Sequence, residues 1–178
     1  MNVRDSVLFD EFYTASVRRI SGYVYAMTGD AAETEDVVQE AYGRAWQHWE
    51  QVSGYANPEA WLRTVAYRIR ISRWRRAAAG FKAHRRHGAA QDLPELSVDY
   101  VALIAALRAI PANQCRAIVL YYLVGLSIEE IAQETGVAAG TVKSQLSRAR
   151  TRLAVLLTDS DGRPGQPQFF AKEASSRA

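Results

Sequence analysis

The sequence predicts an all-α protein of two small helical domains joined by a flexible linker, and three observations support this fold class. Residues 4–78 carry apolar side chains three and four positions apart and show almost no strand alternation. Residues 79–97 mix Gly, Ala, His, Asp and Pro without periodicity, which is typical of a linker. Helical spacing then returns over residues 98–157. The tail, residues 158–178, is rich in Gly, Pro and Ser, so we expect it to be disordered.

The first domain is expected to hold three helices. The first spans roughly Ser6 to Met27, and Gly29-Asp30 breaks it. The second runs from about Ala31 to Trp49. A turn-rich loop follows at Ser53–Pro58, where Gly, Asn and Pro cluster. The third helix begins at Pro58, because proline suits the first turn of a helix.

The second of these helices has a mixed acidic and apolar face. Glu33 and Glu35 lie in its first turns, where the helix dipole favours negative charge. Gln39 and Glu40 lie deeper, where the dipole no longer explains an acid. Such a face suits DNA poorly and indicates a docking surface for a basic protein partner.

The third helix interleaves arginines with aromatic side chains. Its core stripe is Leu62, Val65 and Ile69. Guanidinium groups hold phosphates and aromatic rings stack on bases, so the pattern suits single-stranded or opened DNA. For Tyr67 and Trp74 a packing role remains an equal alternative. The residues on this second face are Arg63, Tyr67, Arg70 and Trp74, extended by Arg73, Arg75 and Arg76.

The second domain is expected to hold four helices, of which the last two form a helix-turn-helix. Pro111 begins its second helix and Gly125 ends it. Ser127 with Glu130 forms a capping box at the start of the third helix, and Gly136 suits the tight turn. The last helix carries a stripe of buried positions (Val142, Leu146, Ala149 and Leu153) opposite a polar and basic surface (Thr141, Lys143, Ser144, Ser147, Arg148 and Thr151). That surface suits a major groove, although a helical hairpin with a solvated charged face is the alternative.

Charge and composition narrow the function classes. The net charge is only +3, but nine basic residues and no acid lie between Glu59 and Asp92, and four basic residues and no acid lie between Glu134 and Asp159. Two concentrated basic segments indicate a polyanion partner. Cys115 is the only cysteine, and neither a signal peptide nor a membrane span is evident. We therefore expect a cytoplasmic protein that has no membrane contact of its own, and no catalytic residue, metal site or cofactor.

The order of these parts resembles a known family. An acidic ETEDVVQEAY helix, a loop with a WLRTVAYRIRISRWRR helix, a linker and a GTVKSQLSRARTRL helix-turn-helix follow one another as in the bacterial group IV sigma factors. These are the extracytoplasmic-function (ECF) type, and the similarity is closest to the SigE-like branch of actinobacteria. It covers residues 5–157 and implies a sigma-2 domain followed by a sigma-4 domain.

The resemblance also implies partners and site residues. It implies that the protein binds core RNA polymerase, duplex promoter DNA at the −35 element and melted DNA at the −10 element, and anti-sigma factors are common regulators in such a family. Core polymerase binding is implied for Asp36, Val37, Val38, Gln39 and Glu40. Contact with the −10 element is implied for Asn57, Arg63, Tyr67, Arg70, Arg73 and Trp74. Contact with the −35 element is implied for Thr141, Lys143, Ser144, Ser147 and Arg148.

The sequence departs from that family at two places, and rival functions remain. Arg68 and Ser72 replace the Asn and Asp of many relatives, and Ser147 is small where some relatives carry a bulky side chain. The main alternative is a LuxR-type regulator, which also ends in a helix-turn-helix but acts without core polymerase. An enzyme is a weaker alternative, because His84 and His87 have no cysteine or carboxylate at ligand spacing. A non-specific nucleic-acid binder would show similar, salt-sensitive affinity for any sequence.

Overall fold

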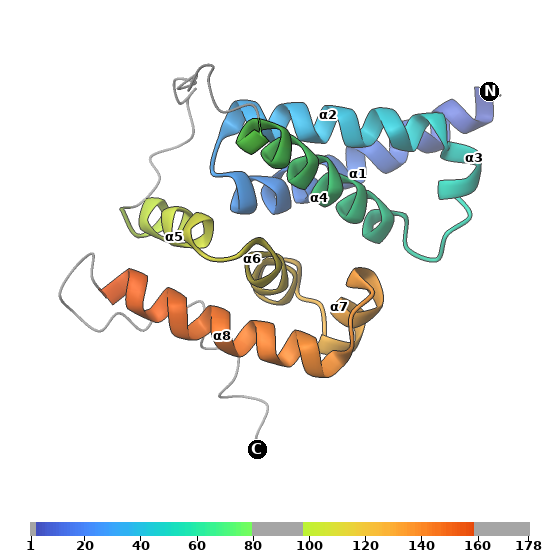
Figure 1. Cartoon of the computed structure of the whole chain (residues 1–178). Helices are drawn as coiled ribbons and strands as arrows, with labels where there is room; N and C mark the ends of the chain where they lie inside the picture. Colours follow the sequence, from blue (N-terminus) through green and yellow to red (C-terminus); the bar gives the residue numbers. More distant parts are fainter. Residues whose placement is uncertain (1–2, 80–97, 159–178) are drawn as a thin grey trace. The chain divides into compact units, whose positions relative to one another are not determined.

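The computed structural model describes residues 3–79 and 98–158, which are helices and their connecting turns with no strand among them (Figure 1). This confirms the predicted all-α fold class. The chain divides into two compact units, so that the described residues 3–79 belong to the first and residues 98–158 to the second. The predicted linker 79–97 and tail 158–178 lie outside the described residues, apart from positions 79 and 158, which end helices. The domain limits 4–78 and 98–157 stay predictions.

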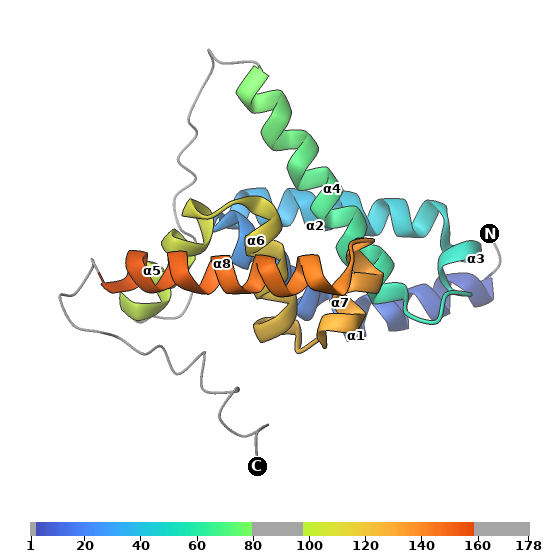
Figure 2. The same cartoon turned by 60° about the horizontal axis from the view of Figure 1, so that its bottom comes forward.

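The first unit contains α1 (Val3–Thr28), α2 (Ala31–Gln47), α3 (Trp49–Val52) and α4 (Pro58–Ala79). Helices α1 and α2 run antiparallel, and α4 packs against both of them (Figures 1 and 2). The stripe predicted for the third helix is buried and faces α1 and α2. The largest fully buried side chains of this unit are Ile20, Tyr23, Val24, Met27, Val37, Val52 and Leu62.

The break between α1 and α2 is built from the two residues predicted for it. Gly29 has a φ of 63°, which an L side chain rarely adopts. Asp30 then caps α2, because its Oδ1 accepts a hydrogen bond from the Glu33 N–H at 2.8 Å. These two local features let α2 fold back along α1.

The second helix ends two residues earlier than predicted. It stops at Gln47, and after His48 the short helix α3 begins at Trp49. The bend turns the Trp49 ring inward, where its centroid lies 5.1 Å from that of Phe9 and 5.2 Å from that of Phe12 on α1. Burial of this large ring, which is 5% exposed, outweighs continuation of a regular helix.

The second unit contains α5 (Val98–Ala109), α6 (Ala112–Ile118), the π-helical segment η1 (Val119–Val124), α7 (Ile128–Thr135) and α8 (Ala139–Thr158). Pro111 precedes α6 and Gly125 ends η1 in the left-handed conformation, with a φ of 84°. The helix predicted between them is therefore present, but its second half widens into a π-helix. Helices α5, α6 and α7 all pack against α8 (Figure 2).

Candidate nucleic-acid interface

The helix-turn-helix is held at its turn by local bonds. The Glu130 N–H donates to Ser127 Oγ at 3.1 Å, and the Ser127 N–H donates to Glu130 Oε2 at 2.7 Å. This second bond from the backbone is the main reason that the pKa of Glu130 lies below its ordinary value. Gly136, with a φ of 72°, ends α7. The capping box and the glycine turn are as predicted, and they place α8 directly after α7.

Helix α8 has one buried side and one open side. Val142, Leu146, Ala149 and Leu153 are all at most 2% exposed. The opposite side presents the five residues expected to meet the −35 element, all of them exposed: Thr141, Lys143, Ser144, Ser147 and Arg148. Within the part of the chain that the structure describes, Lys143 and Arg148 make no hydrogen bond or ion pair. The structure therefore brings these residues together on one accessible surface.

Two other basic residues of α8 hold the helix in the unit. Arg150 Nε donates to the Tyr122 hydroxyl at 3.0 Å, and its guanidinium lies 5.9 Å from the Tyr121 ring centroid. Arg152 Nη1 donates to Gln114 Oε1 at 3.1 Å. Of the four basic residues in this segment, two thus anchor α8 and two remain open to a ligand.

In the first unit, several arginines of α4 are also engaged. Arg63 is only 4% exposed and pairs with Glu59 at 3.7 Å, and Arg19 on α1 binds the same carboxylate. Arg70 Nη2 donates at 2.8 Å to the carbonyl oxygen of Met27 in the last turn of α1. A guanidinium there satisfies a carbonyl that has no partner inside its own helix. Both arginines hold α4 in the first unit.

Arg73 joins α4 to the acidic helix. Its Nη1 donates to Asp36 Oδ2 at 2.9 Å and its Nη2 donates to Glu40 Oε2 at 3.0 Å. Arg44 binds the other oxygen of Glu40 at 2.6 Å. Partial desolvation raises the pKa of Glu40, but the hydrogen bonds from Arg73 and Arg44 outweigh it, so the net pKa lies below the ordinary value. Two predicted core-binding carboxylates therefore bind a predicted DNA-binding arginine.

The remaining residues expected to bind core polymerase differ in exposure. Val37 is 0% and Val38 is 6% exposed, so both lie in the hydrophobic core beneath the acidic face. Gln39 is exposed, and its Nε2 donates to Glu35 Oε1 at 3.1 Å. The accessible part of the predicted docking set is thus Asp36, Gln39 and Glu40. The two valines are neighbours of these polar residues in the sequence. The helical period of 3.6 residues nevertheless turns their side chains into the core of the unit.

The other residues expected at the −10 element lie along the loop and α4. Asn57 is exposed, and its Oδ1 accepts a hydrogen bond from the Ala60 N–H at 3.0 Å, so it caps α4. Tyr67 is half-buried, and Trp74 is 64% exposed, which is unusual for so large a ring. Arg63, Arg70 and Arg73 are engaged with protein groups, so these six residues do not form one continuous open face.

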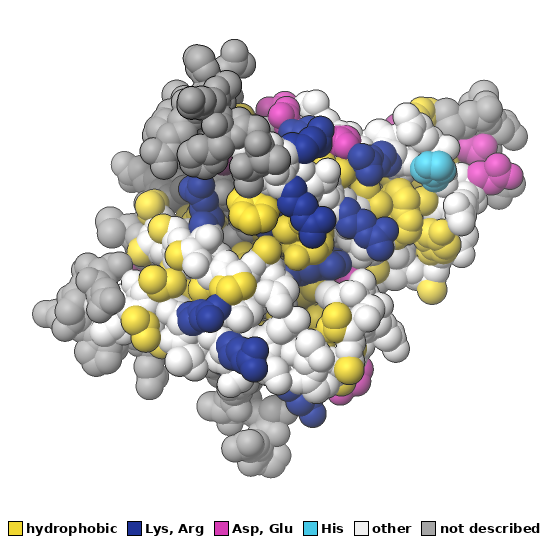
Figure 3. Space-filling view, in the orientation of Figure 1, with side chains coloured by type: hydrophobic (Ala, Val, Ile, Leu, Met, Phe, Trp, Pro, Cys, Tyr) yellow, Lys and Arg dark blue, Asp and Glu magenta, His cyan; other side chains and the backbone are white. Residues whose placement is uncertain are grey.

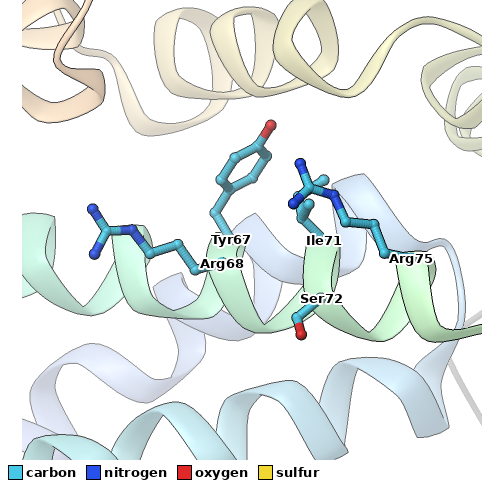
Figure 4. Close-up of a pocket in the computed structure, with 5 residues that line it drawn as sticks. All are labelled: Tyr67, Arg68, Ile71, Ser72 and Arg75. Carbon is cyan, nitrogen blue, oxygen red and sulfur yellow. The ribbon is translucent and has the colours of Figure 1, made fainter.

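The residues assigned to the −10 element from the sequence do not include the most open basic face of α4. Arg68, Ser72 and Arg75 are exposed and share one side of the helix at spacings of four and three. Basic side chains gather over α4 with hydrophobic ones between them (Figure 3). The helical period places Arg68 and Arg75 about 60–140° around the helix from the buried stripe at Leu62, Val65 and Ile69. That spacing is the sequence signal for this face, part of which Figure 4 shows.

A metal site and a membrane span are two further features to consider in the described residues 3–79 and 98–158. Among these residues, no three His, Cys, Asp or Glu side chains lie together as a metal site would require. No described helix combines the length and apolar character needed to cross a membrane.

Two family models match the two units. Residues 12–80 match Sigma-70 region 2, and residues 100–153 match Sigma-70, region 4. The first match contains α2 and α4, and the second contains the helix-turn-helix. Nothing in these matches supports the LuxR-type alternative, which leaves the first unit without a role.

Known proteins with the same organisation extend these matches to most of the chain. The chain is 34% identical over 164 residues to the ECF RNA polymerase sigma factor SigL of Mycobacterium tuberculosis, covering 87% of this chain and 92% of SigL. It is 28% identical over 160 residues to the ECF sigma factor EcfG of Rhodopseudomonas palustris, covering 88% and 85% of the two chains. The sigma factor RpoE of Bartonella quintana, solved in complex with the anti-sigma factor NepR, has a TM-score of 0.71 and 28% identity over 84% of this chain and 96% of that chain. The chain belongs to the ECF family of RNA polymerase sigma factors.

Proposed function

We propose that this sigma factor divides promoter recognition between two basic helix surfaces while the acidic face of α2 docks on core RNA polymerase. As an ECF sigma factor, the protein binds core polymerase and directs promoter recognition and DNA opening at the start of transcription. The observation that carries the division is the open polar face of α8, which stands opposite a fully packed face. A helix built in this way can enter a groove without disturbing its own core.

The −35 element is assigned to α8. Lys143 and Arg148 supply cations that suit phosphates or guanine edges, and the hydroxyls of Thr141 and Ser147 can donate to either. Ser144 Oγ donates to the Gly140 carbonyl oxygen at 3.0 Å, which leaves its lone pairs available as acceptors.

The −10 element is assigned to the loop before α4 and to α4 itself. Extruding a base costs a few kcal/mol, so the protein must bind the unpaired strand better than the duplex. Asn57 keeps its amide N–H groups for an extruded base while its Oδ1 caps the helix. Exposed Trp74 offers a ring for stacking, and stacking contributes about 1–3 kcal/mol per base. Arg63, Tyr67, Arg70 and Arg73 would support this surface.

Core docking is assigned to Asp36, Gln39 and Glu40, with Val37 and Val38 holding α2 in place beneath them. Asp36 is 65% exposed, so a basic segment of polymerase can reach it without unfolding the helix. Docking fixes the separation of the two DNA-binding units, and both then gain from a high effective concentration.

Three finer assignments follow from the family. RpoE of Bartonella quintana was solved with an anti-sigma factor, so we propose an anti-sigma factor as a regulator here too. We also propose that the protein belongs to the SigE-like branch of actinobacteria, an assignment that is based only on the sequences and the order of the motifs. Because the protein acts on polymerase and promoter DNA, we propose that it is cytoplasmic and has no enzymatic activity of its own.

A run-off transcription assay tests the proposal. Core RNA polymerase and a random promoter library should give specific transcripts only when the protein is added. Asp36→Arg should abolish them and remove the protein from the polymerase complex on size-exclusion chromatography, because it reverses the charge of the most exposed acid in the docking set. Glu11→Arg on α1 is the matched charge reversal and should leave both readouts unchanged. Specific transcripts from the Asp36→Arg protein would refute the docking assignment.

A further inference from the structure

The loop that precedes α4, residues 53–57, is exposed along its whole length. Its largest side chain, Tyr55, is 38% exposed. Its backbone bonds are local, since the Tyr55 N–H donates to the Val52 carbonyl oxygen at 3.2 Å and the Trp61 N–H donates to that of Asn57 at 3.4 Å. An exposed loop gains little from packing, so its position is set by the two helices that flank it, α3 and α4.

Both flanks of this loop are fixed on α1. Figure 1 shows the loop running from α3 to the start of α4. On the α3 side, Trp49 packs against Phe12 with ring centroids 5.2 Å apart. On the α4 side, Arg19 Nε donates to Glu59 Oε2 at 3.4 Å, and Arg19 Nη2 donates to Glu59 Oε1. Phe12 and Arg19 are seven residues apart, so they lie on the same face of α1, about 10 Å apart along its axis. Helix α1 thus holds the two ends of the loop at a set separation.

The geometry of the Arg19–Glu59 pair suits a positioning role. A guanidinium that binds both oxygens of a carboxylate fixes the orientation of that carboxylate as well as its distance. Glu59 lies in the first turn of α4, two residues after Asn57, which caps the helix. The Arg19 side chain is 64% exposed, so the pair contributes little to stability. Its removal should therefore displace the loop without unfolding the unit.

A second arginine supports the same carboxylate from within α4. Arg63 Nη1 lies 3.7 Å from Glu59 Oε2, and the Arg63 side chain is 5% exposed. The carboxylate therefore joins a buried cation of α4 to an exposed cation of α1. We propose that Arg19, acting through Glu59, is a positioning residue that sets the loop before α4 for capture of an unpaired base.

The proposal rests on the assignment of this loop to the −10 element and adds a residue of α1 to that site. Loss of the pair should weaken the contact with the captured base and leave contacts elsewhere on the strand unchanged. A general loss of stability would instead weaken all contacts alike. An exposed ion pair is worth up to about a factor of five in an equilibrium constant, which sets the size of the expected loss.

The experiment uses the sigma factor assembled with core RNA polymerase. The probes are fluorescent single strands that carry the non-template sequence of a promoter recovered in the run-off assay. One strand is intact, and each of the others has a single abasic site at one position of the −10 element. Anisotropy titrations give the ratio of intact to abasic affinity at each position, and the largest ratio marks the captured base. Arg19→Ala should lower that ratio by about two- to five-fold and leave the affinity for the abasic strand unchanged.

Two further variants separate positioning from charge. Arg18→Ala removes the neighbouring exposed arginine of α1 and should leave the ratio unchanged. In a Glu59→Ala background, Arg19→Ala should have no further effect, because Arg19 acts only through that carboxylate.

The outcomes distinguish this proposal from the function assigned above. If the unmodified protein shows no preference for the intact strand at any position, the assignment of the loop is wrong and the proposal falls with it. A preference that is present in the unmodified protein and kept in Arg19→Ala rejects only the positioning role. An equal loss in Arg18→Ala, or an equal loss of affinity for the intact and abasic strands, would also overturn that role.

Discussion

Helices α4 and α8 are both basic, yet they use their charges differently. In α8 Arg150 and Arg152 bind Tyr122 and Gln114 of their own unit. The two basic residues predicted to meet DNA, Lys143 and Arg148, are both exposed. In α4 the arginines surround the helix, and Arg63, Arg70 and Arg73 bind carboxylates or a carbonyl of their own unit. Both helices therefore use some basic residues to bind neighbouring helices. They differ in which ones: in α8 the residues predicted to meet DNA are open, whereas in α4 three of the arginines predicted to meet DNA bind protein groups instead.

The largest expected effect comes from the packed side of α8. Leu146 is 2% exposed, so Leu146→Ala should destabilise the second unit by about 2–5 kcal/mol through lost burial and a cavity. Urea unfolding followed by circular dichroism should show an earlier transition for that unit. All four tryptophans lie in the first unit, so tryptophan fluorescence should show its transition unchanged. A shift in fluorescence would mean that the two units unfold together.

The open side of α8 should affect DNA without affecting stability. Lys143→Ala with Arg148→Ala should weaken initiation from promoters that need −35 contacts by at least about 10-fold, because each such contact contributes about 1–3 kcal/mol. Run-off transcription measures this loss, and co-purification with core polymerase should be intact. Arg108→Ala on α5, an exposed arginine of the same unit, is the control. Unchanged promoter use by the double variant would reject α8 as the −35 reader.

Within α4 the two sides should differ in stability. Arg70→Ala removes a charged donor from the Met27 carbonyl and should lower the stability of the first unit by about 1–2 kcal/mol. Arg75→Ala should leave stability nearly unchanged, because Arg75 is exposed. Urea unfolding followed by tryptophan fluorescence compares them directly. Equal losses in the two variants would contradict the division of α4 into a bound side and an open side.

The smallest effect concerns the link between α4 and the acidic helix. The folded-state pKa of Glu40 is lowered, so its contribution is fully present above its ordinary value of 4.5 and is lost as pH falls through the lowered pKa. Glu40→Gln should therefore cost the first unit about 1 kcal/mol at neutral pH, since the ion pairs are partly exposed. The difference from the unmodified protein should vanish on acidification. A difference that persists in acid would show that Glu40 acts by packing alone.

Sequence patterns predicted α8 well because its faces depend on local information. The capping box at Ser127, the glycine at Gly136 and the spacing of Val142 and Leu146 all act within a few residues. The faces of α4 depend on distant partners instead. Nothing in the spacing of Arg73 tells that Asp36, 37 positions earlier, lies opposite it.

Two features of the fold were not predicted from the sequence. The π-helix at Val119–Val124 leaves the apolar pattern of its segment almost unchanged, so no periodicity marks it. The turn at His48 is set by Trp49, whose ring packs on aromatic residues of α1. The contacts that decide this turn join segments that are far apart in the sequence.

The central claim is that α8 binds duplex DNA while the open side of α4 binds an unpaired strand. Polymerase assembled with each double alanine variant, at Lys143 and Arg148 or at Arg68 and Arg75, should be titrated with a duplex −35 fragment and with a single-stranded oligonucleotide. We expect a crossed result, in which the α8 variant loses affinity for the duplex alone and the α4 variant loses affinity for the single strand alone. Loss of the same ligand by both variants would contradict the division of labour between the two helices.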